Sequence, residues 1–246
     1  MKTSIITLLF ALFLPAEIIM RHDVEEHKYF ELAERTGASF IRLNAGCGTF
    51  ISENWIVTAA HVASAPQIGQ DVKVGDKSYA IEQIVIHPDY KDRVSIQHDI
   101  ALIQLKEKVK GQATAKLYTL EYEVGKEIVF VGTGYAGTGD KGLGGDVNKD
   151  RKLRAAQNRI DGIRQDGFIR FKFDAPDSPE ALPLEGISGP GDSGGPALWF
   201  EGDQAYIIGV SSHQDLNGND VEGQYGALEF YTRISEYADW INKTIN

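Results

Sequence analysis

Short apolar runs separated by turn residues make up most of the chain from residue 39 onward. Most of these runs are rich in β-branched and aromatic residues, and Gly, Pro, Asn or Asp bounds them, which is typical of strands. The predicted strands are 39–43, 48–52, 55–58, 71–74, 79–86, 99–105, 127–131, 168–173, 197–200, 206–211 and 227–233. Little helical pattern lies between them, so the spacing predicts an all-β barrel or sandwich.

Helical periodicity is found near the two ends of this region. Residues 23–35 predict a short helix, which Asp23 would cap and for which Glu26 would complete a capping box. The chain ends on a helix over 235–245 that Ser235 can cap. The apolar side chains that share one face of this last helix are Ile234, Ala238, Ile241 and Ile245. We expect that face to pack against the β-structure.

Length, charge and cysteine content limit the class of protein. A chain of 246 residues, 42% of them hydrophobic, is globular and can bury a sizeable core in one large or two small domains. The formal net charge of −10 argues against nucleic acid and anionic membranes as partners. Cys47 is the single cysteine, so no intramolecular disulfide can form, and we expect its side chain to be buried.

The first sixteen residues have the pattern of a secretory signal peptide. Lys2 gives a positive start, residues 5–14 are apolar, and Ala16 is a small residue at the expected cleavage point. The apolar run is too short to span a bilayer as a mature helix. We therefore predict a secreted or periplasmic protein that spans 17–246 after cleavage, with a buried N-terminal helix as the alternative.

The segment Gly-Pro-Gly-Asp-Ser-Gly-Gly-Pro at 189–196 is the strongest chemical signal in the sequence. Glycine lets consecutive backbone N–H groups point at one spot beside an exposed side chain. A serine nucleophile needs such donors, because an oxyanion forms where its oxygen attacks a carbonyl. Ser193 is thus a candidate nucleophile, and the amides of Gly191 and Ser193 are the candidate oxyanion hole. The alternative is an ordinary glycine-rich surface loop.

Two further residues stand at strand ends with chemistry that fits such a serine. An apolar strand runs through small residues into His61, and Asp99 opens a strongly apolar strand. A buried carboxylate needs hydrogen-bond donors, and a histidine N–H would supply one while the carboxylate fixed the imidazole tautomer. Taken singly, His61 could be a structural histidine and Asp99 a strand-end cap, whereas His98 is interpreted as structural.

The combination of three motifs resembles the trypsin-like, chymotrypsin-fold serine proteases over residues 38–246. The motifs are Thr58-Ala59-Ala60-His61, Asp99-Ile100-Ala101-Leu102 and Gly191-Asp192-Ser193-Gly194-Gly195-Pro196, with a weaker echo in His87-Pro88-Asp89-Tyr90. The resemblance implies an all-β fold of two six-stranded antiparallel β-barrels, about 38–118 and 119–234, followed by the C-terminal helix.

The resemblance also implies a mechanism and a class of partner. His61 would be the base, Asp99 would orient it and Ser193 would attack the peptide carbonyl to form an acyl-enzyme. Protein or peptide substrates are implied, and we expect a monomer with no cofactor and no metal. The alternative is a catalytically impaired, protease-like binding protein, which the unusual N-terminus and Gln214 motivate.

Activation is the first point at which the chain departs from that family. In the family, a newly cut N-terminal amine pairs with the aspartate before the nucleophile, which here is Asp192. The nearest candidate is Ile18, which lacks the glycines that follow it in the family. We predict that trimming exposes the Ile18 amine and that it holds Asp192.

Substrate selection is the second departure. Ile187 stands where trypsin carries its charge-selecting aspartate, so a preference for Lys or Arg is not supported by that position. Ser212, His213 and Gln214 would form the edge that binds substrate backbone, and Gln214 would narrow the specificity pocket in place of a glycine. Glu229 aligns with the opposite wall and could restore a preference for basic residues. We expect a preference for small or medium apolar side chains.

Three other kinds of motif match are rejected because the surrounding residues do not fit the motif. The G-x-S-x-G match at 191–195 has the wrong residue order for an α/β-hydrolase, since His213 alone among the histidines follows Ser193. The G-x-G-x-x-G match at 132–137 precedes residues that cannot start a helix. Two oxygen-rich segments, 146–150 and 215–220, lack the Gly and Glu positions of calcium loops, and we interpret both as solvated turns.

Overall fold

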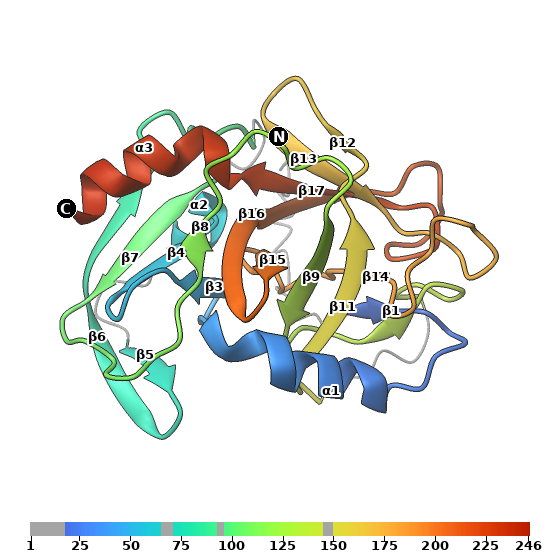
Figure 1. Ribbon diagram of the computed structural model, residues 1–246, viewed down its shortest axis with the longest axis horizontal. Coiled ribbons are helices and arrows are strands. Elements are labelled where there is room, and N and C mark those ends of the chain that lie inside the picture. Colours follow the sequence, from blue (N-terminus) through green and yellow to red (C-terminus); the bar gives the residue numbers. More distant parts are fainter. Residues whose placement is uncertain (1–17, 65–70, 93–95, 145–149) are drawn as a thin grey trace, which may run out of the picture.

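Two large β-sheets form the protein in a computed structural model that describes residues 18–64, 71–92, 96–144 and 150–246 (Figure 1). The first sheet has six strands in the order β2-β3-β4-β7-β6-β5. Its strands are β2 (Phe40–Arg42), β3 (Cys47–Phe50), β4 (Trp55–Thr58), β5 (Asp71–Val74), β6 (Lys77–Ile86) and β7 (Ala101–Leu105). Every neighbouring pair in this sheet is antiparallel.

The second sheet has eight strands, in the order β11-β9-β15-β16-β17-β13-β12 with β8 beside β16. Its strands are β8 (Lys116–Leu117), β9 (Glu127–Gly132), β11 (Arg154–Arg159), β12 (Gly162–Ile163), β13 (Phe168–Lys172), β15 (Pro196–Glu201), β16 (Gln204–Asp215) and β17 (Leu228–Arg233). The predicted all-β class with two barrel-like sheets is confirmed. The second sheet exceeds the implied six strands because two-residue β8 and β12 pair with β16 and β13.

A third, small sheet holds the beginning of the described chain. It consists of β1 (Ile19–Met20) between β10 (Gly137–Thr138) and β14 (Gly186–Ile187). Ile18 and Ile19 are fully buried. The signal peptide predicted for 1–16 lies outside the described residues.

Four short helical segments complete the chain: α1 (His27–Thr36), the 3-10 turn η1 (Gly37–Ser39), α2 (Ala60–Ala63) and α3 (Ile234–Ile245). The apolar face predicted for the last helix is correct, because Ile234, Ala238 and Ile241 are buried. Within the described residues, no helix is long and apolar enough to cross a membrane.

The predicted helix caps are wrong. No side chain caps α1, because Asp23 binds Arg21 and Glu26 binds the buried Arg154. No side chain caps α3 either, because the Ser235 hydroxyl donates to Glu123 Oε1 at 2.6 Å. Asp23 has a local ionic partner two residues away, whereas Glu26 and Ser235 bind charged groups that lie more than 100 residues away in the sequence.

One apolar core joins the two large sheets. Val57 and Leu102 of the six-stranded sheet belong to the same buried cluster as Val131 and Leu198 of the eight-stranded sheet. Cys47 is free and fully buried, as predicted. Because the sheets share this core, loops from both are held at fixed positions along the seam between them.

Candidate active site

The pairing of β4 with β7 brings His61 and Asp99 together. Thr58, the last residue of β4, pairs with Ala101, the first residue of β7. The short helix α2, which follows β4 and carries His61, therefore lies next to Asp99, two residues before β7. His61 Nδ1 lies 2.7 Å from Asp99 Oδ2, and the His61 backbone N–H donates to Asp99 Oδ1 at 2.9 Å. Two hydrogen bonds to one carboxylate fix both the position and the rotation of the imidazole.

Asp99 is buried but well supplied with donors. Its exposed fraction is 1%, and besides His61 it accepts a hydrogen bond from the Ser212 hydroxyl at 2.7 Å to Oδ2. The Thr232 hydroxyl donates to the Asp99 main-chain carbonyl at 2.9 Å. These bonds offset the cost of burying the carboxylate. With Nδ1 of His61 donating to Asp99, Nε2 is the ring nitrogen that can accept a proton.

The loop that carries Ser193 is seated against the strand that leads to His61. Ser193 is partly exposed, and its carbonyl accepts the Cys47 N–H at 2.8 Å. Gly194 has a φ of +79°, and a Cβ there would overlap Thr58 Oγ1 and lie 3.0 Å from the Ala59 nitrogen. Only glycine therefore fits this position, and the glycine lets Ser193 approach the end of β4 closely.

Gly46 provides a second point of contact between the two segments. A Cβ added to Gly46 would lie 2.5 Å from the Ser193 carbonyl oxygen and 2.8 Å from Val62 Cγ2. Val62 directly follows His61, so the backbone of Ser193 and the turn that carries His61 meet across one glycine. Gly191, in the same loop as Ser193, has a φ of +101°, a conformation that side chains disfavour.

Asp192 is held by the backbone. Its exposed fraction is 1%, and its carboxylate accepts the N–H groups of Thr133, Gly134 and Gly189 at 3.1, 3.1 and 3.2 Å. The donors from Thr133 and Gly134 tie the Ser193 loop to the segment after β9, and the donor from Gly189 lies within the loop. Ile18 is buried at the start of β1, and its pairing with Asp192 stays a prediction.

A third buried carboxylate, Glu229 of β17, lies among neutral donors. Its exposed fraction is 3%, and Oε2 accepts the Ser188 N–H at 3.2 Å and the Ser188 hydroxyl at 2.7 Å. Gln214 Nε2 donates to Oε1 at 3.2 Å. Burial raises the pKa of Glu229 to about 7, although the bonds from Ser188 and Gln214 oppose that rise.

The Gln214 side chain connects three segments of the chain. Its amide nitrogen reaches Glu229 and, at 3.5 Å, the Ser188 carbonyl, while its Oε1 accepts the Gly223 N–H at 3.1 Å. Ile187, next to Ser188, is fully buried and packs with Ile19, Phe173 and Ala227. Gln214, Ser188 and Glu229 thus form one bonded group, whereas Ile187 lies in an apolar cluster.

His213 belongs to a hydrogen-bonded chain that ends at Asp99. Its Nε2 lies 3.2 Å from Arg164 Nη1 and its Nδ1 lies 3.2 Å from the Ser212 hydroxyl. Burial and the Arg164 charge lower the pKa of His213 to about 4, so the ring is neutral and accepts from Arg164. Its Nδ1–H then donates to Ser212, which donates to Asp99. Sequence reasoning missed Arg164 and Ser188, because neither belongs to a motif.

Comparisons with known proteins show which family the chain resembles. The family model described as Trypsin matches residues 33–241. Chymotrypsin-like elastase family member 1 of Macaca fascicularis is 28% identical over 217 residues, which cover 80% of this chain and 77% of that protein. Phenoloxidase-activating factor 3 of Holotrichia diomphalia is 26% identical over 260 residues. The alignment covers 91% of this chain and 70% of that protein.

A solved structure shares the fold. Neuropsin, described as a serine protease expressed in the limbic system of mouse brain, aligns with a TM-score of 0.64 and 20% identity over 92% of this chain and 99% of its own. The match of the family model spans most of the chain and includes the segments that carry His61, Asp99 and Ser193. The chain therefore belongs to the trypsin family of serine proteases.

Proposed function

We propose that this protein is a serine endopeptidase in which Ser193, His61 and Asp99 carry the reaction. The observation that carries the proposal is the His61–Asp99 pair, in which a carboxylate with an exposed fraction of 1% accepts both the Nδ1–H and the backbone N–H of one histidine. Such a carboxylate stabilises an imidazolium beside it, as general-base catalysis requires.

In the proposed reaction, His61 Nε2 takes the proton from Ser193 Oγ as that oxygen bonds to the peptide carbonyl carbon. The amides of Gly191 and Ser193 bind the resulting oxyanion. His61 then gives the proton to the leaving amine as the C–N bond breaks, which leaves an acyl-enzyme. Water attacks the ester with His61 again as base, and the acid product leaves.

The proposed preference is for small or medium apolar side chains on the residue before the cleaved bond. By resemblance, Ile187, Ser212–Gln214 and Glu229 line the specificity pocket. The Gln214 amide bonds to Ser188, to Glu229 and to Gly223, so it occupies space between these segments and covers the carboxylate. His213 and Ser212 are proposed to bind the substrate backbone, with Ile187 beneath them.

Export and activation complete the proposal. Residues 1–16 would direct secretion, and a further trim would make Ile18 the N-terminus. Ile18 is buried and directly precedes β1, whose Ile19 pairs with Ile187 of β14 near the start of the Ser193 loop, which supports an amine that pairs with Asp192. N-terminal sequencing of active secreted protein tests this step, and a start at any other residue contradicts it.

Covalent labelling tests the reaction itself. A fluorescent organophosphonate should label the processed protein, and Ser193→Ala should abolish labelling and lower casein turnover by about a million-fold, as in subtilisin, which has the same triad on another fold. Ser178→Ala, at a surface serine that bonds Asp174, is the matched control and should keep both signals. Correctly processed protein that neither labels nor cleaves casein would support the alternative, a protease-like binding protein.

A further inference from the structure

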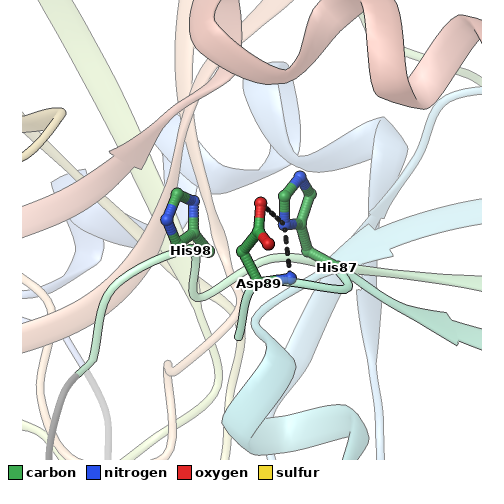
Figure 2. A group of neighbouring side chains, drawn as sticks. All are labelled: His87, Asp89 and His98. Atoms are coloured by element: carbon green, nitrogen blue, oxygen red, sulfur yellow. Dashed lines mark hydrogen bonds and ion pairs between the residues drawn. The ribbon is translucent and has the colours of Figure 1, made fainter. Parts of the chain in front are cut away.

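Three side chains with metal-binding chemistry gather where the loop after β6 returns to β7. They are His87, Asp89 and His98, and their ligand atoms all lie within 4.8 Å of one another. Figure 2 shows the Asp89 carboxylate between the two imidazoles in that view. None of the three belongs to the proposed catalytic group, and the sequence motifs predict no metal.

Backbone pairing and aromatic contacts hold the two histidines in place. His87 directly follows β6, and its backbone N–H donates to the Ile100 carbonyl at 3.1 Å, two residues beyond His98. The two rings are stacked with centroids 5.2 Å apart and an angle of 10° between their planes. Tyr237 and Trp240 of α3 contact the His87 ring edge to face at 5.1 and 4.9 Å. Aromatic packing therefore limits how far the imidazoles can turn.

The hydrogen bonds leave the lone pair on Nε2 of His98 for a cation, and a cation at Nδ1 of His87 would replace one long hydrogen bond. His87 Nδ1 accepts the Asp89 N–H at 3.3 Å and lies 4.0 Å from Asp89 Oδ2. With its lone pair on Nδ1, the His87 ring turns an electron-rich nitrogen toward the electron-rich Oδ2 of Asp89, and a cation would fit between these two atoms. His98 Nδ1 lies 3.0 Å from the Tyr237 hydroxyl. A hydroxyl that accepts Nδ1–H leaves Nε2 of His98 to bind metal, as bonds to the second ring nitrogen do in metal sites.

The backbone directs His98 away from the reaction site. His98 has a φ of +56°, which residues other than glycine rarely adopt. Its ring contacts His87 and Tyr237, whereas the carboxylate of the next residue, Asp99, contacts His61. The unusual conformation therefore separates two neighbouring side chains, and it puts His98 into the cluster.

Access and donor type favour one class of ion. The Asp89 side chain is 70% exposed and free to rotate toward the rings, whereas that of His87 is 12% exposed. Two imidazoles and a carboxylate suit zinc and its neighbours, while calcium and magnesium require mainly oxygen ligands. Tetrahedral zinc needs ligand atoms about 3.3 Å apart, so side-chain rotation must bring these atoms closer by at most about 1.5 Å.

We propose that His87, Asp89 and His98 bind one transition-metal dication of the zinc class, with water as the fourth ligand. The ion would join the two ends of the loop between β6 and β7, beside Asp99. A sequence with one cysteine has no intramolecular disulfide to do this. A metal bound by the folded state and not by the unfolded chain stabilises the fold.

Metal titration in a Ser193→Ala background tests the site independently of the proposed proteolysis. Zn²⁺ should bind with a stoichiometry of one per chain by calorimetry, and Co²⁺ should give the visible absorption of a tetrahedral complex. At about a hundred times the dissociation constant, Zn²⁺ should raise the Tm by roughly 5–10 °C, and Ca²⁺ should not. Absence of saturable binding of both Zn²⁺ and Co²⁺ overturns the proposal.

Variants locate the ion. His87→Asn, Asp89→Asn and His98→Asn should each weaken Zn²⁺ binding by about tenfold or more, and Tyr237→Phe by about tenfold. His27→Asn, at an exposed histidine of α1, is the matched control and should bind as the parent does. A Tm in EDTA close to that of the parent establishes that each variant folds. Binding that survives both His87→Asn and His98→Asn would put the ion elsewhere and overturn the proposal.

Discussion

Asp99 and Glu229, two buried carboxylates that accept hydrogen bonds from β16, have nearly the same exposure and different partners. Their exposed fractions are 1% and 3%, and a hydroxyl donates to each at 2.7 Å. Strand β16 supplies one donor to each, Ser212 to Asp99 and Gln214 to Glu229. The remaining donors differ in kind. Asp99 faces the imidazole of His61, whereas Glu229 faces the neutral hydroxyl and N–H of Ser188.

The partners decide what each carboxylate can do. An imidazole can become a cation next to Asp99, so that carboxylate is suited to stabilising charge that develops during a reaction. Ser188 and Gln214 remain neutral, and burial raises the pKa of Glu229 to about 7. The charge on Glu229 therefore depends on pH near neutrality, which suits a group that affects recognition more than chemistry.

The largest expected effect comes from removing the charge of Asp99. Asp99→Asn should lower kcat on a peptide substrate by about 10,000-fold, because the amide favours the wrong imidazole tautomer, as the same change does in trypsin-like enzymes. Steady-state kinetics with active-site titration measure this. Asp203→Asn, at an exposed aspartate between β15 and β16, is the control and should retain activity. A loss below tenfold in Asp99→Asn would mean that Asp99 plays no orienting role.

The next effect concerns stability and the pKa of Glu229. Below pH 4.5 the group is protonated in both the folded and the unfolded chain. Between pH 4.5 and 7 the unfolded chain releases the proton while the folded one keeps it, so stability falls as pH rises. From pH 5 to pH 8 this lowers the free energy of unfolding by roughly 2–3 kcal/mol.

Glu229→Gln should remove that decline. In a Ser193→Ala background, urea unfolding at pH 5 and pH 8 should show the variant gaining roughly 2–3 kcal/mol on the parent between the two values. Glu185, whose pKa burial raises to about 8, contributes equally to both proteins and cancels in the difference. A parent–variant difference that is the same at both pH values would show that Glu229 is ionised throughout.

Much of this comparison could be predicted from the sequence, because it depends on local signals. Strand ends locate His61 and Asp99, and the pairing of β4 with β7 then brings them together. The helix caps could not be predicted, since Glu26 and Ser235 find charged partners that only tertiary folding supplies. A capping preference of about 1 kcal/mol is easily overcome by such bonds.

The surroundings of Glu229 could not be predicted for a different reason. Alignment put Gln214 and Glu229 on opposite walls, but it left open whether the carboxylate points inward. A shift in strand register between Ser211 and His213 of β16 changes which residues face β17. In the structure Gln214 pairs with Glu229 in the strand register and bonds to its side chain. One irregular position therefore decides a contact that no local pattern encodes.

The smallest effect tests whether Gln214 masks Glu229. Gln214→Gly removes the amide that covers Oε1 and opens space for a substrate side chain. Above pH 7, where Glu229 is charged, kcat/KM for substrates with Lys before the cleaved bond should rise about tenfold to a hundredfold. The kcat/KM for substrates with Ala at that position should change little.

A double variant is the control. Adding Glu229→Gln to Gln214→Gly should cancel the gain for Lys, because the newly opened space would then hold no charge. An equal gain for Lys and for uncharged residues of similar length would mean that Gln214 acts by volume alone, and that Glu229 takes no part in recognition.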